Sequence, residues 1–155
     1  MAISQPTVSN NYQMYQAGSP DAPSTALTLV ASLVFTAAGF TNPAAGDISL
    51  IRLPAGRWSI SLDLSRIVCP AGTVNSDLDI GIGAYRKLST GANQSLVGNA
   101  LADSLDVGGG ALNQSLGTGA VMVDPFTGAD IVCSFDTANS PASGLMVLTL
   151  VFRPA

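Results

Sequence analysis

Glutamate is absent from this chain, and lysine occurs once, at Lys87. These residues are among the strong helix formers, whereas Gly, Pro, Ser, Thr and Asn, which favour turns and caps, are plentiful. Short apolar segments recur at intervals of roughly ten residues and are separated by Pro and Gly turns. The sequence therefore predicts an all-β domain.

The segment 57–65 has the clearest strand pattern, because its even positions are apolar and its odd positions are polar. Trp58 shares the apolar face with Ile60, which favours core packing, but an aromatic platform for a sugar ring or a subunit contact is the alternative. The preceding segment 47–53 ends at Pro54-Ala55-Gly56. We expect these two segments to form a hairpin around that turn.

Other segments are expected to form further strands. The segment 95–107 has apolar residues near helical spacing, so that a short helix and a strand both stay open there. The last strand is apolar on both faces, which predicts a central place in a sheet or a place at a subunit contact. The expected strands comprise one or two over 24–40 and single strands over 77–85, 121–124, 129–137 and 144–153.

The predicted fold is an antiparallel β-sandwich of jelly-roll type, formed by a single domain over residues 24–155. Residues 1–23 are polar and rich in Ser, Asn, Gln and Pro, which predicts an extended N-terminal arm. Tyr12, Met14 and Tyr15 lie within this arm and are residue types that anchor on a partner surface.

Charge and hydropathy exclude several classes of partner. The net charge of −4 argues against nucleic acid, because phosphate contacts require clustered Lys and Arg. The longest apolar stretch, 26–38, is shorter than the roughly 20 residues that cross a bilayer. No Lys or Arg precedes Arg52, so a secretory signal is not expected. We expect a soluble chain, made in the host cytoplasm, with no membrane or nucleic-acid partner.

The residues for catalysis or metal binding are few. The chain has no His, and Cys69 and Cys133 lack CxxC spacing, so free buried thiols are favoured over a disulfide or a zinc site. Asp77 and Asp79 fit no calcium-binding loop. Gly81-Ile82-Gly83 lacks the third glycine of a phosphate loop, and a strand with a close neighbour explains it better. We therefore expect no metal, no cofactor and no enzymatic activity.

The surplus of apolar residues, with a mean hydropathy of +0.40, predicts contacts with other subunits. Arg52, Arg57 and Arg66 lie in or beside the expected hairpin and could pair with aspartates across strands or across a subunit boundary. Phe152, in the doubly apolar last strand, is a further candidate for a contact with a partner protein or another subunit.

Several segments together resemble a known family. GDISLIRLPAG at 46–56, LDIGIGAYR at 78–86, NALADSLDV at 99–107 and GADIVCSF at 128–135, with the apolar last strand, are similar to the small virion proteins that decorate the heads of tailed bacteriophages. The resemblance covers residues 45–155. It implies a jelly-roll-like domain, a symmetric homo-oligomer that is often a trimer, and docking on the outer capsid shell.

From the residues and the resemblance we expect a capsid decoration, or cement, protein on the outer surface of a virion. Its partner would be the major capsid protein, and it would stabilise the shell by burying apolar area across the joints between capsid subunits. The alternative is a carbohydrate- or host-binding β-sandwich of a phage fibre or tail. Sugar sites use exposed aromatic residues, and this chain has only 6% aromatic residues.

Overall fold

A computed structural model describes residues 29–36, 48–72, 77–135 and 145–155. Within these ranges every helix or strand is a β-strand, which confirms the all-β prediction. The expected arm over 1–23 lies outside the described residues. The strands are β1 (Leu29–Thr36), β2 (Ile48–Leu53), β3 (Trp58–Cys69), β4 (Asp77–Ile82), β5 (Tyr85–Arg86), β6 (Asn93–Gln94), β7 (Val97–Asp106), β8 (Leu112–Ser115), β9 (Ala120–Val123), β10 (Ala129–Phe135) and β11 (Leu145–Pro154).

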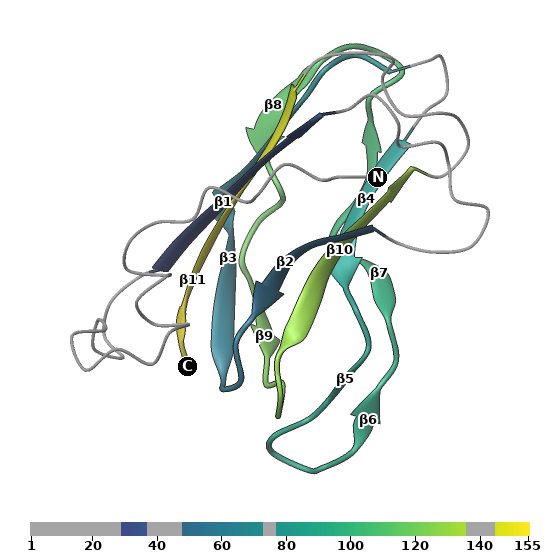
Figure 1. Cartoon of the computed structure of the whole chain (residues 1–155). Coiled ribbons are helices and arrows are strands. Elements are labelled where there is room, and N and C mark those ends of the chain that lie inside the picture. The colour runs from purple at the N-terminus through teal and green to yellow at the C-terminus, as the bar shows by residue number, and fades with distance from the viewer. Residues whose placement is uncertain (1–28, 37–47, 73–76, 136–144) are drawn as a thin grey trace.

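The long strands form two antiparallel sheets that pack against each other, as predicted for a β-sandwich (Figure 1). The first sheet has the order β1-β11-β3-β8, and β9 pairs with the other half of β3. The second sheet has the order β2-β10-β4-β7. The short β5 and β6 form a separate hairpin that extends beyond one end of the sandwich, which we call the hairpin end (Figure 1).

The hairpin expected around Pro54-Ala55-Gly56 is wrong. β2 pairs with β10 in the second sheet, whereas β3 pairs with β11 in the first. Gly56 takes φ 134°, where glycine is favoured, and its N–H donates to the carbonyl oxygen of Pro125 at 3.0 Å. The turn therefore carries the chain from one sheet to the other. A strand with one apolar face fits both a hairpin within one sheet and two strands that face each other from opposite sheets, because the apolar face is buried in either case.

Two open expectations are resolved. The segment 95–107 is strand β7, not a helix. β11 lies between β1 and β3, so the doubly apolar last strand occupies the central place expected for it. In β11 the even positions 146 to 152 face the core, and Val151 on the opposite face is also buried.

The core is built around the ring of Trp58, which contacts the ring of Phe152 edge to face at a centroid distance of 5.2 Å. The indole N–H of Trp58 donates to the carbonyl oxygen of Pro54 at 2.9 Å, so its polar atom is satisfied inside the protein. Trp58 is fully buried and is therefore a core residue, as favoured, and not a sugar platform. Other large, fully buried side chains are Phe135, Leu53, Ile60, Ile67 and Leu78.

β4 and β7 approach each other unusually closely at Gly81. A Cβ atom at this position would lie 2.2 Å from the carbonyl oxygen of Val97, so only glycine fits without movement of the backbone. This is the close neighbour predicted for the Gly-Ile-Gly segment. Asp79 is also buried, and its Oδ1 accepts a hydrogen bond from the N–H of Ser104, which has φ 51° in an irregular part of β7.

β3 contains a large bulge. Ser61 pairs with Val151 and Arg66 with Thr149, so four residues of β3 face one residue of β11. Inside the bulge the buried Ser65 accepts a hydrogen bond on Oγ from the N–H of Val151 at 2.9 Å, and on its carbonyl oxygen from Leu116. These bonds replace the ladder that the bulge interrupts, which makes the bulge an ordered feature of the sheet.

Candidate functional site

Charge is distributed unevenly over the sandwich. Most of the basic side chains lie toward the hairpin end, whereas carboxylates on β4 and β7 lie toward the other end, as the pairing of Asp77 with Asp106 and the course of both strands show (Figure 1). The chain as a whole is acidic. The hairpin end also contains the carboxylates of Asp124 and Asp130, but its basic side chains outnumber them, so it is a basic region on an acidic protein. Its basic residues are Arg52, Arg57, Arg86, Lys87 and Arg153.

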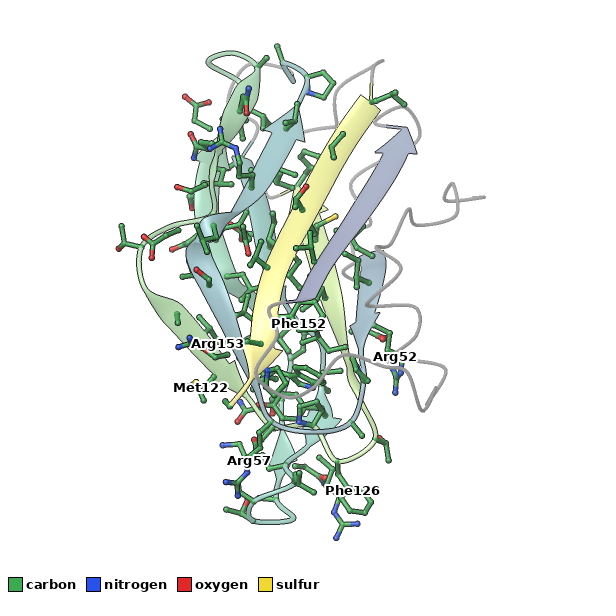
Figure 2. The ribbon with its side chains drawn as sticks, turned by 90° about the vertical axis from the view of Figure 1, so that its left-hand side faces the viewer. Arg52, Arg57, Met122, Phe126, Phe152 and Arg153 are labelled. Atoms are coloured by element: carbon green, nitrogen blue, oxygen red, sulfur yellow. The ribbon has the colours of Figure 1, made fainter. Side chains whose placement is uncertain are left out.

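Phe126 is exposed at the tip of this end (Figure 2). Leu88, in the turn of the β5-β6 hairpin, is a second exposed apolar side chain there. The guanidinium of Arg86 lies 5.5 Å from the centre of the Phe126 ring, and its Nε donates to the carbonyl oxygen of Gly91 at 3.0 Å. The N–H of Phe126 donates to the carbonyl oxygen of Arg86 at 2.7 Å. Phe126 is therefore 51% exposed on a backbone that a hydrogen bond holds in place.

Asp124 organises the turn beside the tip. Its Oδ2 accepts hydrogen bonds from both the hydroxyl and the N–H of Ser89, and these bonds, with smaller effects of Lys87 and Arg57, lower the pKa of its carboxyl. Asp124 thus stays ionised at neutral pH. Its backbone carbonyl oxygen also accepts a hydrogen bond from the N–H of Leu88, which holds the segment that carries Leu88 in place.

Met122 projects from one flank of the hairpin end and is 64% exposed (Figure 2). It separates two concavities, and Lys87 lines both. The first, of about 320 Å³, contains the charged side chains of Arg57 and Asp124 beside Ser89 and Thr90, although most of its lining surface is apolar. The second, of about 220 Å³, is lined mainly by apolar atoms, from Ile82, Tyr85, Val97, Ala100 and Val121 among others.

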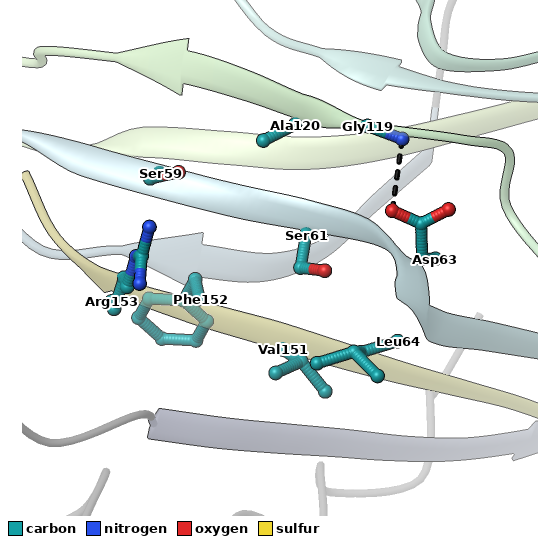
Figure 3. Close-up of a pocket in the computed structure, with 9 residues that line it drawn as sticks. All are labelled: Ser59, Ser61, Asp63, Leu64, Gly119, Ala120, Val151, Phe152 and Arg153. Carbon is teal, nitrogen blue, oxygen red and sulfur yellow. Dashed lines mark hydrogen bonds between the residues drawn. The ribbon is translucent and has the colours of Figure 1, made fainter.

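A third hollow, of about 320 Å³, lies on the outer face of the first sheet beside the β3 bulge (Figure 3). Ser59 and Ser61 line its floor, and Asp63 lies at its edge, where its Oδ2 accepts a hydrogen bond from the N–H of Gly119 at 2.9 Å. Leu64 stands beside the hollow and is 63% exposed. The bulge thus presents an apolar side chain next to a carboxylate.

The contact residues predicted from the sequence are not brought together in one place. Arg52 forms an ion pair with Asp130 at 2.8 Å within the second sheet. Arg66 donates to Oδ1 and the carbonyl oxygen of Asn113 on β8, away from the hairpin end. Arg57 alone lines a concavity of the candidate surface. Tyr12, Met14 and Tyr15 lie outside the described residues.

The expectation that Phe152 contacts a partner is corrected by the structure. Phe152 is 1% exposed and packs against Trp58 in the core. Its strand is apolar on both faces because it lies in the middle of a sheet, and Phe152 lies on the face that points inward.

The exposed apolar side chains of Leu64, Leu88, Met122 and Phe126 were not predicted from the sequence. Leu64 follows the even-position pattern of 57–65 and is expected inside, but the bulge changes the direction of the strand before it. Met122 and Phe126 lie in a short strand and a turn, where a few residues give no periodicity to interpret.

Nothing in the described ranges groups three Asp or Cys side chains as metal ligands. No helix of the described chain has the length and hydropathy to cross a membrane. Comparisons with protein-family models, with curated proteins and with solved structures each found no match. The function of this chain is therefore inferred from its exposed surfaces.

Proposed function

We propose that this chain is a virion structural protein: a decoration, or cement, protein that binds the outer surface of a tailed-phage head and bridges its capsid subunits. The observation that carries the proposal is the hairpin end, where exposed Phe126 and Leu88 lie among basic side chains on an otherwise acidic sandwich. Such a combination suits attachment to an acidic protein surface with apolar sites.

The strand order supports a jelly roll as the finer fold. Successive long strands alternate between the sheets, except for β4 and β7, which are neighbours in the second sheet; the two orders are β1-β11-β3-β8/β9 and β2-β10-β4-β7. Double-sheet jelly rolls occur in viral capsid proteins and in lectins, so this order is compatible with a virion component without deciding its role.

The energetics of attachment depend on copy number. Burying one Phe or Leu side chain contributes about 1.5–3 kcal/mol, from which the entropic cost of association must be subtracted. A single tip therefore binds weakly. Because a shell repeats the same joint many times, many weak contacts add up to a substantial stabilisation of the whole shell against opening.

The test uses heads from the source phage that lack the chain. We expect the purified protein to co-sediment with these heads and to raise the temperature at which they release DNA. Phe126→Asp should abolish co-sedimentation, because it places a carboxylate where an apolar contact is needed.

Leu145→Asp is the matched control, since Leu145 is also exposed, at 59%, but lies at the start of β11, at the opposite end of the sandwich (Figure 1). It should bind like the unchanged chain. Failure of the unchanged chain to bind the heads would refute the proposed function, whereas normal binding by Phe126→Asp would exclude the tip as the attachment site.

No structural observation favours the alternative of carbohydrate binding. The aromatic residue considered for a sugar platform, Trp58, is buried, and its N–H is already bonded to Pro54.

A further inference from the structure

The β3 bulge presents a knob on the outer face of the first sheet. Leu64, 63% exposed, is the apolar part of the knob, and the Asp63 carboxylate lies next to it (Figure 3). Only Oδ2 of Asp63 is used by the bond to Gly119, which leaves Oδ1 open to a partner as far as the described chain shows. Because hydrogen bonds hold the bulge in shape, Leu64 is a fixed apolar contact point for a second molecule.

The apolar concavity beside Met122 has the complementary character. It is lined by Val97, Ala100 and Val121, and the side chain of Lys87 lies at its border. Within the described residues, the Lys87 ammonium interacts electrostatically with Asp124 but forms no hydrogen bond or ion pair with it. A concavity with apolar walls and an ammonium at its border can receive the Leu64 side chain and place the Asp63 carboxylate next to Lys87.

We infer that the chain binds a second copy of itself, with Leu64 of one copy entering the concavity beside Met122 of the next and Asp63 pairing with Lys87. Charge complementarity supports this occupant, because the knob carries a carboxylate and the concavity an ammonium. The contact also covers Leu64 and Met122, two of the most exposed large apolar side chains. The inference does not depend on capsid binding.

The knob and the concavity are different patches of the same molecule. The knob lies on the outer face of the first sheet, and the concavity lies where β9 of that sheet meets β4 and β7 of the second. The contact is therefore heterologous, and it closes into a ring when the rotation between neighbours permits closure.

The test is the mass of the purified chain in solution, measured by light scattering over a range of concentrations. The unchanged chain should be an oligomer. Leu64→Asp and Met122→Asp should each raise the dissociation constant by about tenfold or more, because each places a carboxylate in an apolar contact. Lys87→Gln and Asp63→Asn should weaken association less, and Asp63→Asn retains an acceptor for Gly119.

Mixing the two monomeric variants tests the heterologous geometry. The Met122→Asp chain has an intact knob and the Leu64→Asp chain has an intact concavity, so a mixture should form a heterodimer. Leu145→Asp, which changes an exposed leucine elsewhere, should keep the oligomeric mass. Leu64→Ser serves as a second knob variant if Leu64→Asp loses the circular dichroism spectrum of the folded protein.

Three results would overturn the inference: a monomeric unchanged chain, an unchanged mass in the Leu64 variants, or a mixture that stays monomeric. The capsid proposal has separate outcomes. A monomer that still binds phage heads refutes only the contact between copies, and an oligomer of the expected kind that ignores the heads refutes only the proposed function.

Discussion

Two buried residues show that a position's surroundings, and not its burial alone, decide which changes it tolerates. At Gly81 the neighbouring backbone occupies the space of a side chain, and backbone does not yield as a flexible side chain does. At Cys69 the surroundings leave room for the thiol but withhold the water that its ionised form needs, which raises its pKa to about 12.

Gly81→Ala should destabilise the protein by about 3 kcal/mol or more, the upper range for overpacking, because the new Cβ meets backbone atoms of Val97 and Gly98. Gly117→Ala is the control, since a Cβ there lies 3.5 Å from the flexible end of Leu62. Urea denaturation followed by Trp58 fluorescence measures both. Equal stability of the two variants would contradict the close approach of β4 and β7.

Burial of Cys69 makes stability depend on pH at the alkaline side. The thiol ionises at its ordinary pKa of 9.0 when unfolded and at about 12 when folded, so stability from this group is complete below pH 9 and is lost as the pH rises from 9 toward 12. The difference in unfolding free energy between the unchanged chain and Cys69→Ala should shrink from about pH 7 to about pH 10.5. A constant difference would show that the thiol ionises equally in both states.

At the scale of elements, the irregular parts of the strands place the functional surfaces. The β3 bulge turns Leu64 outward and forms the hollow next to it, and hydrogen bonds from Val151, Leu116 and Gly119 hold its shape. The buried hydroxyl of Ser65 is the innermost of these partners. Loss of a buried partner costs more than an average hydrogen bond contributes, because the other group stays without water.

Ser65→Ala should therefore lower the unfolding free energy by about 1–3 kcal/mol, since it leaves the N–H of Val151 without its acceptor. Ser61→Ala, on the same strand but at a half-buried hydroxyl, should cost less than about 0.5 kcal/mol. Chemical denaturation of the three proteins makes the comparison. If the two variants are equally stable, Ser65 does not support the bulge.

At the scale of the whole molecule, no covalent link joins the two sheets in the described chain. Cys69 ends β3 in the first sheet and Cys133 lies in β10 of the second, and both are buried thiols that form no disulfide, as favoured from the sequence. The sandwich is held by the packing of its inner faces, with Trp58 and Phe152 at the centre of the contact.

Excess dithiothreitol should consequently leave the thermal unfolding midpoint unchanged. Under denaturing conditions without reductant, a thiol-specific reagent should titrate two groups per chain. The same reagent should react slowly with the folded protein, because both thiols are buried. A midpoint that falls on reduction, or fewer thiols in the denatured chain, would indicate a disulfide in solution.

Local patterns predicted most of the long strands, but they left helix and strand open over 95–107 and gave no strand at β6 or β8. Alternation in 57–65, the doubly apolar last segment and the shortage of helix formers are properties of neighbouring residues, so the all-β class, the central place of β11, the buried Trp58 and the close neighbour at Gly81-Ile82-Gly83 were all predicted. The expected decoration function and the role of the arm stay predictions. Both depend on binding partners, and no motif in the sequence identifies such a partner.

Long-range pairing decided the rest. Alternation of apolar and polar residues indicates that one face of a strand is buried, but not which strand pairs with it. The hairpin predicted for β2 and β3 is wrong for this reason, since the two strands belong to different sheets. The exposure of Leu64 depends on how four residues of β3 fit against one residue of β11, and the tip depends on how Phe126 meets Arg86. The sequence by itself determined the all-β class and most of the long strands, because these follow from adjacent side chains. Only the tertiary structure determined the surfaces, because each surface is assembled from strands that are distant in the chain.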